Sequence, residues 1–440
     1  MKLPAYPRYK SSGVEWLGDV PEHWEVKRLK TSAACWVSNV DKVPAEDEMP
    51  VRLCNYTDVY YHEHITPEME LMETTATGEE IHRFGLLEGD VLITKDSEEW
   101  NDIAVPALVK KSAPDLVCGY HLAITRPRPA VLSGDYLLRA FQSCAINQQF
   151  QVAASGVTRY GLPKSSIGGA CIPLPSVPEQ RAIAAFLDRE TGRVDRLVGK
   201  KRELIERLQE KRAALIARTV TRGLNDRTIP VIRLRFFLSR IDTGFTPDSQ
   251  NFPATNGESG VLKSGCVNRG IFDPTENKIL SDDVAPPAKL EVKCGDVLMS
   301  RASGSADLIG SVAMVKEQPC AHLYLSDKTF RLRVNSSKCC PRFLVFAMGS
   351  TFLRGQIEQI ISGAEGLAKN IAQGDIRELL IPAPPLPEQR AMADYLDAET
   401  GKLDGLVAKV GEAVERLQEY RTALITAAVT GKIDVRNAER

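Results

Sequence analysis

Cysteine and histidine are the residues of this chain whose chemistry would be easiest to read from spacing, as metal ligands or nucleophiles. The ten cysteines form no CxxC pair, and the adjacent Cys339 and Cys340 lack the spacing of a zinc ligand set. His62 and His64 flank Glu63 in "YHEHIT", and two histidines without a third ligand are more typical of a surface loop than of a metal site. The pattern predicts reduced thiols and no metal centre.

Length and composition narrow the class of protein. A chain of 440 residues with 43% apolar and 26% charged residues is expected to form two or more globular domains. A formal net charge of −1 gives no overall basic field for nucleic acid, although a local patch can still exist. The start, "MKLPAYPRYK", lacks the apolar core of a signal peptide, and no apolar run reaches membrane-span length. We therefore expect a cytoplasmic protein without a membrane partner.

An internal repeat is the feature that must position any functional residues. The segment "PEQRAIAAFLDRETGRVDRLVGKK" begins at Pro178, and "PEQRAMADYLDAETGKLDGLVAKV" begins at Pro387. The two copies agree at about 27 of 47 positions without a gap, which is an internal duplication. Each copy follows a proline-rich run, "IPLPSVPEQR" or "IPAPPLPEQR". Proline disfavours a helix upstream of itself and is favoured in the first turn, so each copy is predicted to start a helix here. Glu179 and Glu388 then lie near the positive end of that helix.

Each copy is predicted to form a helix of about 40 residues, about 60 Å long, which needs a partner to be stable. The other copy is the nearest partner, and an antiparallel pair would place two globular parts at opposite ends of a rod. A parallel pair, or pairing between chains, would also satisfy the pattern. Apolar residues recur at steps of three and four along each helix and form a predicted coiled-coil seam. Two lysines interrupt the first seam, and their long stems can cover apolar surface. The predicted seams are Val194, Leu197, Lys201, Leu204, Leu208, Lys211 and Leu215 in the first copy, and Leu403, Leu406, Val410, Ala413, Leu417, Tyr420 and Leu424 in the second.

The blocks in front of the two helices have short β-branched runs between turn residues, as in "GDVLITKDS" from Gly89 and "GDVLMSRAS" from Gly295. This texture predicts an α+β fold with two mixed, strand-rich domains and two long helices pairing as a coiled coil. The expected segments are a first globular domain over 1–175, a helical spacer over 176–224, a second globular domain over 225–385 and a second spacer over 386–440. A rod with two unlike heads suits a split, asymmetric target.

These landmarks together closely resemble one family. "YPRYKSSGVEWLGDVPEHWEVKRLK", the two "PEQR" helix starts, the two "GDVL" turns, and "SGVTRYGLPK" and "SGAEGLAKN" resemble, in their order and duplication, the specificity subunit (HsdS) of type I restriction-modification systems. The resemblance covers nearly the whole chain. One departure is that the second block opens with "DTGFTPDSQN", close to the family's "GGTP", whereas the first has "ACWVSNVDKV" around Cys35. Two unlike heads are therefore expected.

The resemblance implies two target recognition domains that each read one half of a bipartite site in double-stranded DNA. It also implies helices that set the spacing and dock two adenine methyltransferase subunits, with ATP-dependent endonuclease subunits as a further addition. This chain would be non-catalytic and without a cofactor, because S-adenosylmethionine belongs to the methyltransferase and ATP and Mg²⁺ to the endonuclease. The sequence contains no glycine-rich cofactor loop with an (N/D)PP(Y/F) motif and no P-loop.

Loop residues with phosphate-binding or base-reading side chains are the predicted DNA contacts. For each of them an ordinary solvated side chain is the alternative, and Tyr160 could pack internally. The first block offers Lys95, Ser97, Thr158, Arg159, Tyr160 and Lys164, and the second offers Lys263, Arg269, Ser300, Arg301, Ser303, Lys369 and Asn370.

The duplicated helix starts are the predicted docking seats for the methyltransferase, with a purely local helix-start role as the alternative. The residues concerned are Gln180, Arg181, Gln389 and Arg390. Two other classes of protein remain as alternatives for the whole chain. A structural coiled-coil protein would explain the helices but not the landmark-sharing heads, and a self-contained DNA-modifying enzyme would need the missing cofactor motifs.

Overall fold

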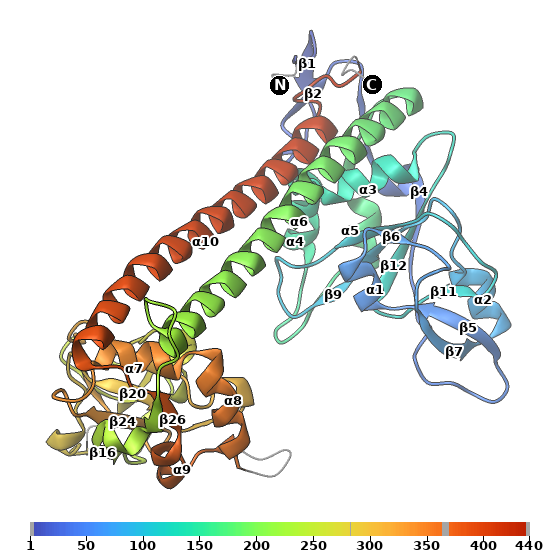
Figure 1. The fold of residues 1–440 in the computed structure, drawn as a ribbon. Helices are drawn as coiled ribbons and strands as arrows, with labels where there is room; N and C mark the ends of the chain where they lie inside the picture. Colours follow the sequence, from blue (N-terminus) through green and yellow to red (C-terminus); the bar gives the residue numbers. More distant parts are fainter. Residues whose placement is uncertain (1–3, 282, 363–368, 437–440) are drawn as a thin grey trace. The chain divides into compact units, whose positions relative to one another are not determined.

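A computed structural model describes residues 4–281, 283–362 and 369–436 of the chain (Figure 1). The elements fall into two compact units, of which unit 1 contains Met1–Arg202 with Glu412–Arg440 and unit 2 contains Glu203–Gly411. Each unit therefore holds one strand-rich head together with part of each of two long helices. The predicted α+β class and the two long helices are confirmed.

The two long helices are α6, Val177–Arg222, and α10, Leu386–Val429, of 46 and 44 residues. Their contacts within each unit show that they run antiparallel, as predicted. In unit 1, Asp195 of α6 lies 3.0 Å from Arg421 of α10, and Val198 packs against Val414. In unit 2, Arg212 of α6 lies 2.8 Å from Asp404. Asp195 and Asp404 occupy equivalent positions of the repeat, as do Arg212 and Arg421. The same ion pair therefore occurs in both units, with the aspartate on α6 in unit 1 and on α10 in unit 2.

The predicted heptad seam is wrong at alternate positions. Val194, Leu403 and Leu424 are buried as predicted, but the next seam position is displaced by one residue. Val198 and Val414 are buried instead, and the exposed members of the predicted seam are Leu197, Leu204, Lys211, Leu406 and Tyr420. Leu197 and Val198 are adjacent apolar residues that both fit a spacing of three to four. The sequence pattern could not choose between them, and the packing of the facing helix does.

The head of unit 1 is built on an antiparallel sheet with one parallel edge strand. Its order is β4-β12-β8-β10-β6, with bounds Ala33–Val37, Leu122–Pro127, Val91–Thr94, Pro106–Val109 and His64–Ile65. A smaller sheet has the order β11-β5-β7, with bounds Leu116–Cys118, Met49–Cys54 and Met72–Ala76. The helices are α1, Tyr56–Tyr61; α2, Gly78–Phe84; α3, Gly134–Gln142; α4, Cys144–Ala153; and α5, Lys164–Gly169. Short strand pairs complete the unit: β1, Tyr9–Ser11, with β2, Asp19–Pro21; β3, Glu25–Arg28, with β14, Cys171–Leu174; and β9, Asp96–Ser97, with β13, Tyr160–Gly161.

The head of unit 2 repeats most of this plan. Its larger sheet has the order β16-β24-β20-β22, with bounds Leu238–Thr243, Thr329–Val334, Val297–Ser300 and Val312–Met314. The smaller sheet has the order β17-β19-β18-β23, with bounds Ser249–Gln250, Asn277–Leu280, Ser259–Leu262 and His322–Tyr324. The helices are α7, Pro341–Met348; α8, Thr351–Ile360; and α9, Gln373–Glu378. The short pairs are β15, Val231–Arg233, with β26, Leu380–Pro382, and β21, Ala302–Ser303, with β25, Lys369–Asn370.

The duplicated "GDVL" landmark is a turn that leads into the central strand of each head. Gly89 and Gly295 have φ of 89° and 90°, a left-handed conformation that favours glycine. The following aspartate accepts a hydrogen bond from a backbone N–H of its own turn, at 2.8 Å for Asp90 and 2.9 Å for Asp296. Each aspartate also pairs with an arginine of the neighbouring strand, Arg126 at 2.7 Å in the first head and a buried arginine of β24 at 2.9 Å in the second. The landmark therefore positions β8 and β20, from which the predicted functional loops begin.

Candidate nucleic-acid interface

The first head brings four of its six predicted DNA contacts to one short strand pair. Ser97 of β9 lies opposite Tyr160 of β13, and the backbone N–H of Leu162 donates to the carbonyl of Lys95 at 2.8 Å. Arg159 lies in the turn that enters β13, and its side chain is exposed. Two segments about 60 residues apart in the sequence are thus joined by backbone hydrogen bonds.

The side chains in this cluster differ in how available they are. Thr158 and Lys164, which begins α5, are exposed like Arg159. The ammonium of Lys95 lies 2.6 Å from the carboxylate of Asp96. Ser97 is buried, and Tyr160 packs against the core of the head. The exposed cationic and hydroxyl groups are therefore the ones that can reach a phosphate directly.

The second head uses the same device at β21 and β25. Ser303 lies opposite Lys369, and the backbone N–H of Ile371 donates to the carbonyl of Arg301 at 3.1 Å. Asn370 of β25 lies opposite Ala302. In each head, therefore, a short antiparallel strand pair brings together residues that the sequence predicted as DNA contacts. The pair is β9–β13 in the first head and β21–β25 in the second.

Two residues of the second set are held inside the head. Ser300 lies on β20 and is fully buried, so its hydroxyl is not at the surface as the loop prediction assumed. The guanidinium of Arg301 donates to the carbonyl of Asp327 at 3.0 Å and lies 5.4 Å from the ring centre of Phe330. These contacts fix Arg301, whereas Lys369 is half-exposed and has no ion pair with any residue between 4 and 436 that the structure describes.

Lys263 and Arg269 lie at the two ends of a third element. Lys263 is the residue before the 3₁₀ helix η3, Ser264–Gly270, and is half-buried. Arg269 lies within η3, and its side chain is outside the part of the chain that the structure describes. Because η3 packs against β21, this segment adjoins the β21–β25 pair.

Sequence reasoning missed a cavity beside the first cluster. It has a volume of about 510 Å³ and is lined by Arg159, by Tyr56 and Tyr60 of α1, and by Glu98 and Glu99 of the loop after β9. A hydrogen bond to Asp102 raises the pKa of Tyr60 to about 12. The signal was the tyrosine run "YTDVYY", which lies far in the sequence from the acidic loop that it joins.

The two glutamines predicted to dock a partner are buried and bonded within their own unit. The amide oxygen of Gln180 accepts from the backbone N–H of Ser133 at 2.9 Å, and its nitrogen donates to the carbonyls of Val131 and Pro175 at 2.8 and 2.9 Å. Gln389 makes the equivalent bond with the backbone N–H of Cys340 at 2.8 Å. Both side chains tie a long helix to the start of α3 or α7, so a partner cannot reach them. The local role kept as the alternative fits these two residues.

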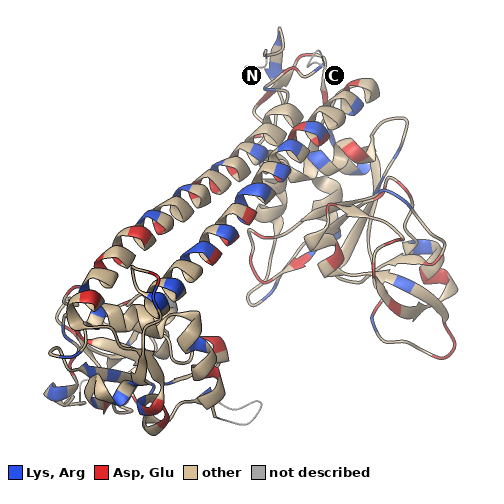
Figure 2. Cartoon of the chain, viewed as in Figure 1, with Lys and Arg blue, Asp and Glu red and all other residues tan. Residues whose placement is uncertain are grey.

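The glutamate beside each glutamine ties the chain segments around its helix start. Glu179 accepts hydrogen bonds from the hydroxyl of Tyr6 at 2.9 Å and the indole N–H of Trp24 at 3.1 Å. Glu388 lies 2.6 Å from the guanidinium of Arg227. Arg181 and Arg390, by contrast, are exposed. Basic and acidic residues alternate along both long helices (Figure 2), as expected for solvated helix faces.

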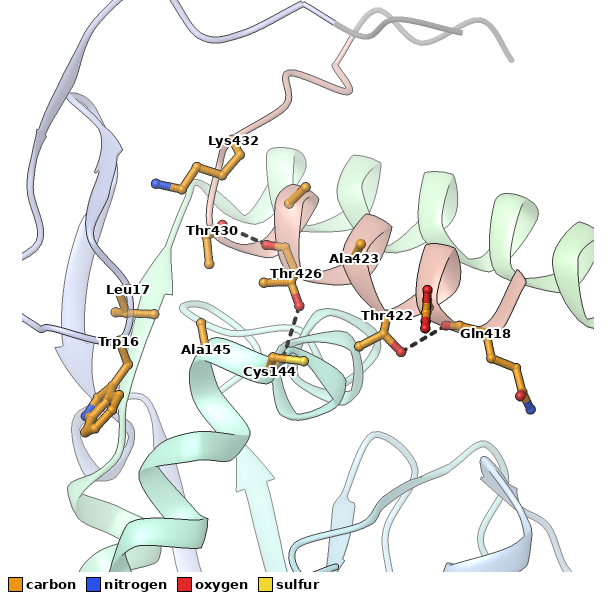
Figure 3. A pocket seen from close by; sticks show the side chains of 12 residues that line it. Trp16, Leu17, Cys144, Ala145, Gln418, Thr422, Ala423, Thr426, Thr430 and Lys432 are labelled. Carbon is orange, nitrogen blue, oxygen red and sulfur yellow. Dashed lines mark hydrogen bonds between the residues drawn. The ribbon is translucent and has the colours of Figure 1, made fainter. Parts of the chain in front are cut away.

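Unit 1 also contains an apolar groove beside the last turns of α10 (Figure 3). The groove has a volume of about 760 Å³ and is lined by Trp16, Cys144, Ala423 and Thr426 among others. The backbone N–H of Cys144 donates to the hydroxyl of Thr426 at 3.1 Å and so fixes α4 against the helix. Trp16 remains 39% exposed at its edge.

In the motif "YHEHIT", Glu63 forms ion pairs, and His62 and His64 on either side of it are exposed. Glu63 pairs with Arg421 of α10 at 2.9 Å and with the buried Arg139 of α3. No group of three or more potential metal ligands occurs among the residues that the structure describes. Within the same residues, no helix is long and apolar enough to cross a membrane.

Comparisons with known proteins place this architecture. A provisionally named type I restriction enzyme MjaX specificity subunit of Methanocaldococcus jannaschii is 23% identical over 437 residues, 96% of each chain. The type I restriction enzyme EcoKI specificity subunit of Escherichia coli is 21% identical over 321 residues, 72% of this chain and 68% of that protein. No family model matches the sequence.

A solved structure agrees at the level of the fold. A chain from a structural study of complex assembly and conformational transition in the type I restriction-modification system is 19% identical. It has a TM-score of 0.68 and covers 93% of this chain and 98% of its own length. These sequence matches agree with the resemblance that the landmarks indicated, and the solved structure agrees with it in fold. The chain is thus similar to the specificity subunits (HsdS) of type I restriction-modification systems.

Proposed function

We propose that this chain is the DNA-specificity subunit of a type I restriction-modification complex, in which each head reads one half of a split, asymmetric site. The observation that carries the proposal is the shared frame at β9–β13 and β21–β25. Both heads present basic and polar side chains from the same strand pairing, but the side chains themselves differ. One docking geometry with two different sets of reading residues suits two unlike half-sites.

The chain supplies recognition, and catalysis belongs to its partners. Two adenine methyltransferase subunits would use S-adenosylmethionine, and endonuclease subunits, where present, would use ATP and Mg²⁺. The duplication offers two equivalent seats for the methyltransferase, with the exposed Arg181 and Arg390 at the same position of each copy. A chromosomal DNA target would place the complex in the cytoplasm.

The long helices would set the distance between the half-sites. At 1.5 Å per residue, helices of 46 and 44 residues are about 69 and 66 Å long. A B-DNA turn is about 34 Å, so helices of this length suit half-sites one to two turns apart. Two heads on one subunit also raise the effective concentration for the second contact once the first has formed.

Genome-wide mapping of N6-methyladenine, with and without the gene, tests the proposal. We expect a split, asymmetric methylated motif that disappears on deletion. The variants Arg159→Ala and Lys369→Ala then assign the halves, because the first removes an exposed cation from the first head and the second removes a half-exposed cation from the second. Each should weaken DNA binding by the purified methyltransferase complex and lower the slope of log affinity against log salt by about 1.

The matched control is Arg83→Ala, which removes an exposed arginine of α2 outside both clusters. It should leave affinity and salt slope unchanged. A methylome that does not depend on the gene while the methyltransferase is expressed would contradict the proposal, as would a purified complex without sequence-specific DNA binding. Binding of S-adenosylmethionine by the isolated chain would indicate a self-contained enzyme instead.

A further inference from the structure

The loop after the central strand is held in the same way in both heads. The backbone N–H of Ala104 donates to the carbonyl of Thr94 at 3.0 Å, and that of Gly310 donates to the carbonyl of Ser300 at 2.9 Å. Ala104 and Gly310 also share a left-handed backbone, with φ of 60° and 80°. The enclosed segments, 95–103 and 301–309, have equal length, so their residues correspond one to one.

The side chains on this shared frame differ in charge. Residues 96–102 read "DSEEWND", whereas 302–308 read "ASGSADL". The first segment carries four carboxylates and the second carries one. Glu98 and Glu99 correspond to Gly304 and Ser305. Both segments begin with a two-residue strand and are closed by the same backbone hydrogen bond, although Ala306–Leu308 of the second form a 3₁₀ helix. At Glu98 and Glu99 the difference therefore lies in the groups that the two heads offer to a ligand.

Carboxylates beside DNA have a restricted use. They repel phosphates, but they accept hydrogen bonds from the exocyclic amino groups of bases in the major groove, of which cytosine N4 is the usual partner. Two of the four are already engaged, since Asp96 lies 2.8 Å from His121 and Asp102 accepts from the hydroxyl of Tyr60 at 2.7 Å. Glu98 and Glu99 are exposed, and no residue in the described ranges forms an ion pair with them.

The cavity beside this loop supplies an independent reason to expect a base there. Its volume is about 510 Å³, and Glu98, Glu99 and Arg159 line it together with tyrosines of α1. The rings of Tyr56 and Tyr60 are stacked, with centres 5.5 Å apart and an angle of 17° between their planes. This wall offers aromatic surface to a base edge, while Arg159 offers a cation to the adjacent phosphate.

We infer that Glu98 and Glu99 are the base-reading carboxylates of the first head, and that they accept a hydrogen bond from the N4 amino group of a cytosine in the first half-site. Arg159 neutralises the phosphate next to that base. The second head has Gly304 and Ser305 at these positions and reads its half-site without this contact. The inference rests on the proposed function and specifies it at one position.

The test uses the full chain in complex with its methyltransferase subunits. Binding is measured to a panel of duplexes in which each base pair of both half-sites is changed singly. In the variant Glu98→Gln with Glu99→Gln, preference for cytosine at one position of the first half-site should fall about 5- to 150-fold. Adenine should gain at that position, because glutamine pairs with adenine N6 and N7. Preferences in the second half-site should not change.

Glu70→Gln with Glu88→Gln is the matched control, since it removes two exposed charges from the same head outside the cavity. It should leave every preference as in the wild type. A wild-type complex with clear preferences that the Glu98 and Glu99 variant keeps in full would overturn this inference alone. A wild type without sequence preference would overturn the proposed function as well. If the double variant does not have the wild-type unfolding temperature, Glu98→Gln and Glu99→Gln are compared singly, and unchanged preferences in both overturn the inference.

Discussion

Substitution of Gln180 by methionine separates the two roles considered for the helix starts. Methionine has a similar length and fills the site, but it has no hydrogen-bond donor and its sulfur is only a weak acceptor. The change removes three hydrogen bonds, one accepted from the backbone N–H of Ser133 and two donated to the carbonyls of Val131 and Pro175. All three partners belong to the same unit.

The expected cost follows from these bonds. Each contributes about 1 kcal/mol net, so unit 1 should lose about 3 kcal/mol of unfolding free energy, and more if the Ser133 N–H finds no water. For a unit of 231 residues, counted from its two segments of 202 and 29, about 3 kcal/mol lowers the unfolding temperature by about 6 to 12 °C. The equivalent Gln389→Met should destabilise unit 2 in the same way.

Calorimetry of the full chain with hydrogen exchange at the Ser133 amide provides the assay. The local role predicts a lower unfolding temperature and faster exchange at this amide. Arg181→Met is the control, because its side chain is exposed on the next residue of the same helix. Wild-type stability and exchange together with weaker methyltransferase binding in Gln180→Met would refute the reasoning and restore a docking role for the glutamine.

Three further predictions address docking, spacing and pH. Arg181→Glu with Arg390→Glu should weaken methyltransferase binding by the chain without changing its unfolding temperature; unchanged binding in a pull-down would remove both residues from the docking surface. Deleting one heptad from each long helix, residues 201–207 and 410–416, shortens the pair by about 10 Å, or about three base pairs, and the gap in the methylated motif should shrink accordingly. Partial burial raises the pKa of Asp242, but hydrogen bonds and charges from two arginines of β24 more than offset it, so this pKa lies below the ordinary value. The stabilisation by ionised Asp242 is therefore complete above the unfolded-state pKa of about 3.9 and is lost as the pH falls through the lower native pKa. The stability difference between the wild type and Asp242→Asn, measured by denaturant titration, should shrink below about pH 3.9.

The long helices and the two-unit plan could be predicted because they depend on local signals. Proline at the first turn, a duplicated segment and steps of three and four between apolar residues are properties of neighbouring positions. The exact seam depends on the partner helix. Leu197 and Val198 are both apolar in sequence, and Val198 is the one that is buried, in a cluster with Val194 and with Val414 of the facing helix.

The candidate interface divides in the same way. The sequence by itself determined that Arg159 belongs to a loop, that the heads share landmarks and that the chain resembles a known family. Lys369, also predicted on a turn-like stretch, lies on strand β25. Only the tertiary structure decided that Ser300 and Gln180 are buried, because burial depends on what packs from distant parts of the chain. It also joined the acidic loop at Glu98 to the tyrosines of α1, since backbone hydrogen bonds and packing bring together residues about 40 positions apart. Local propensities do not specify contacts between distant segments, so a site of this kind can be identified only in the folded structure.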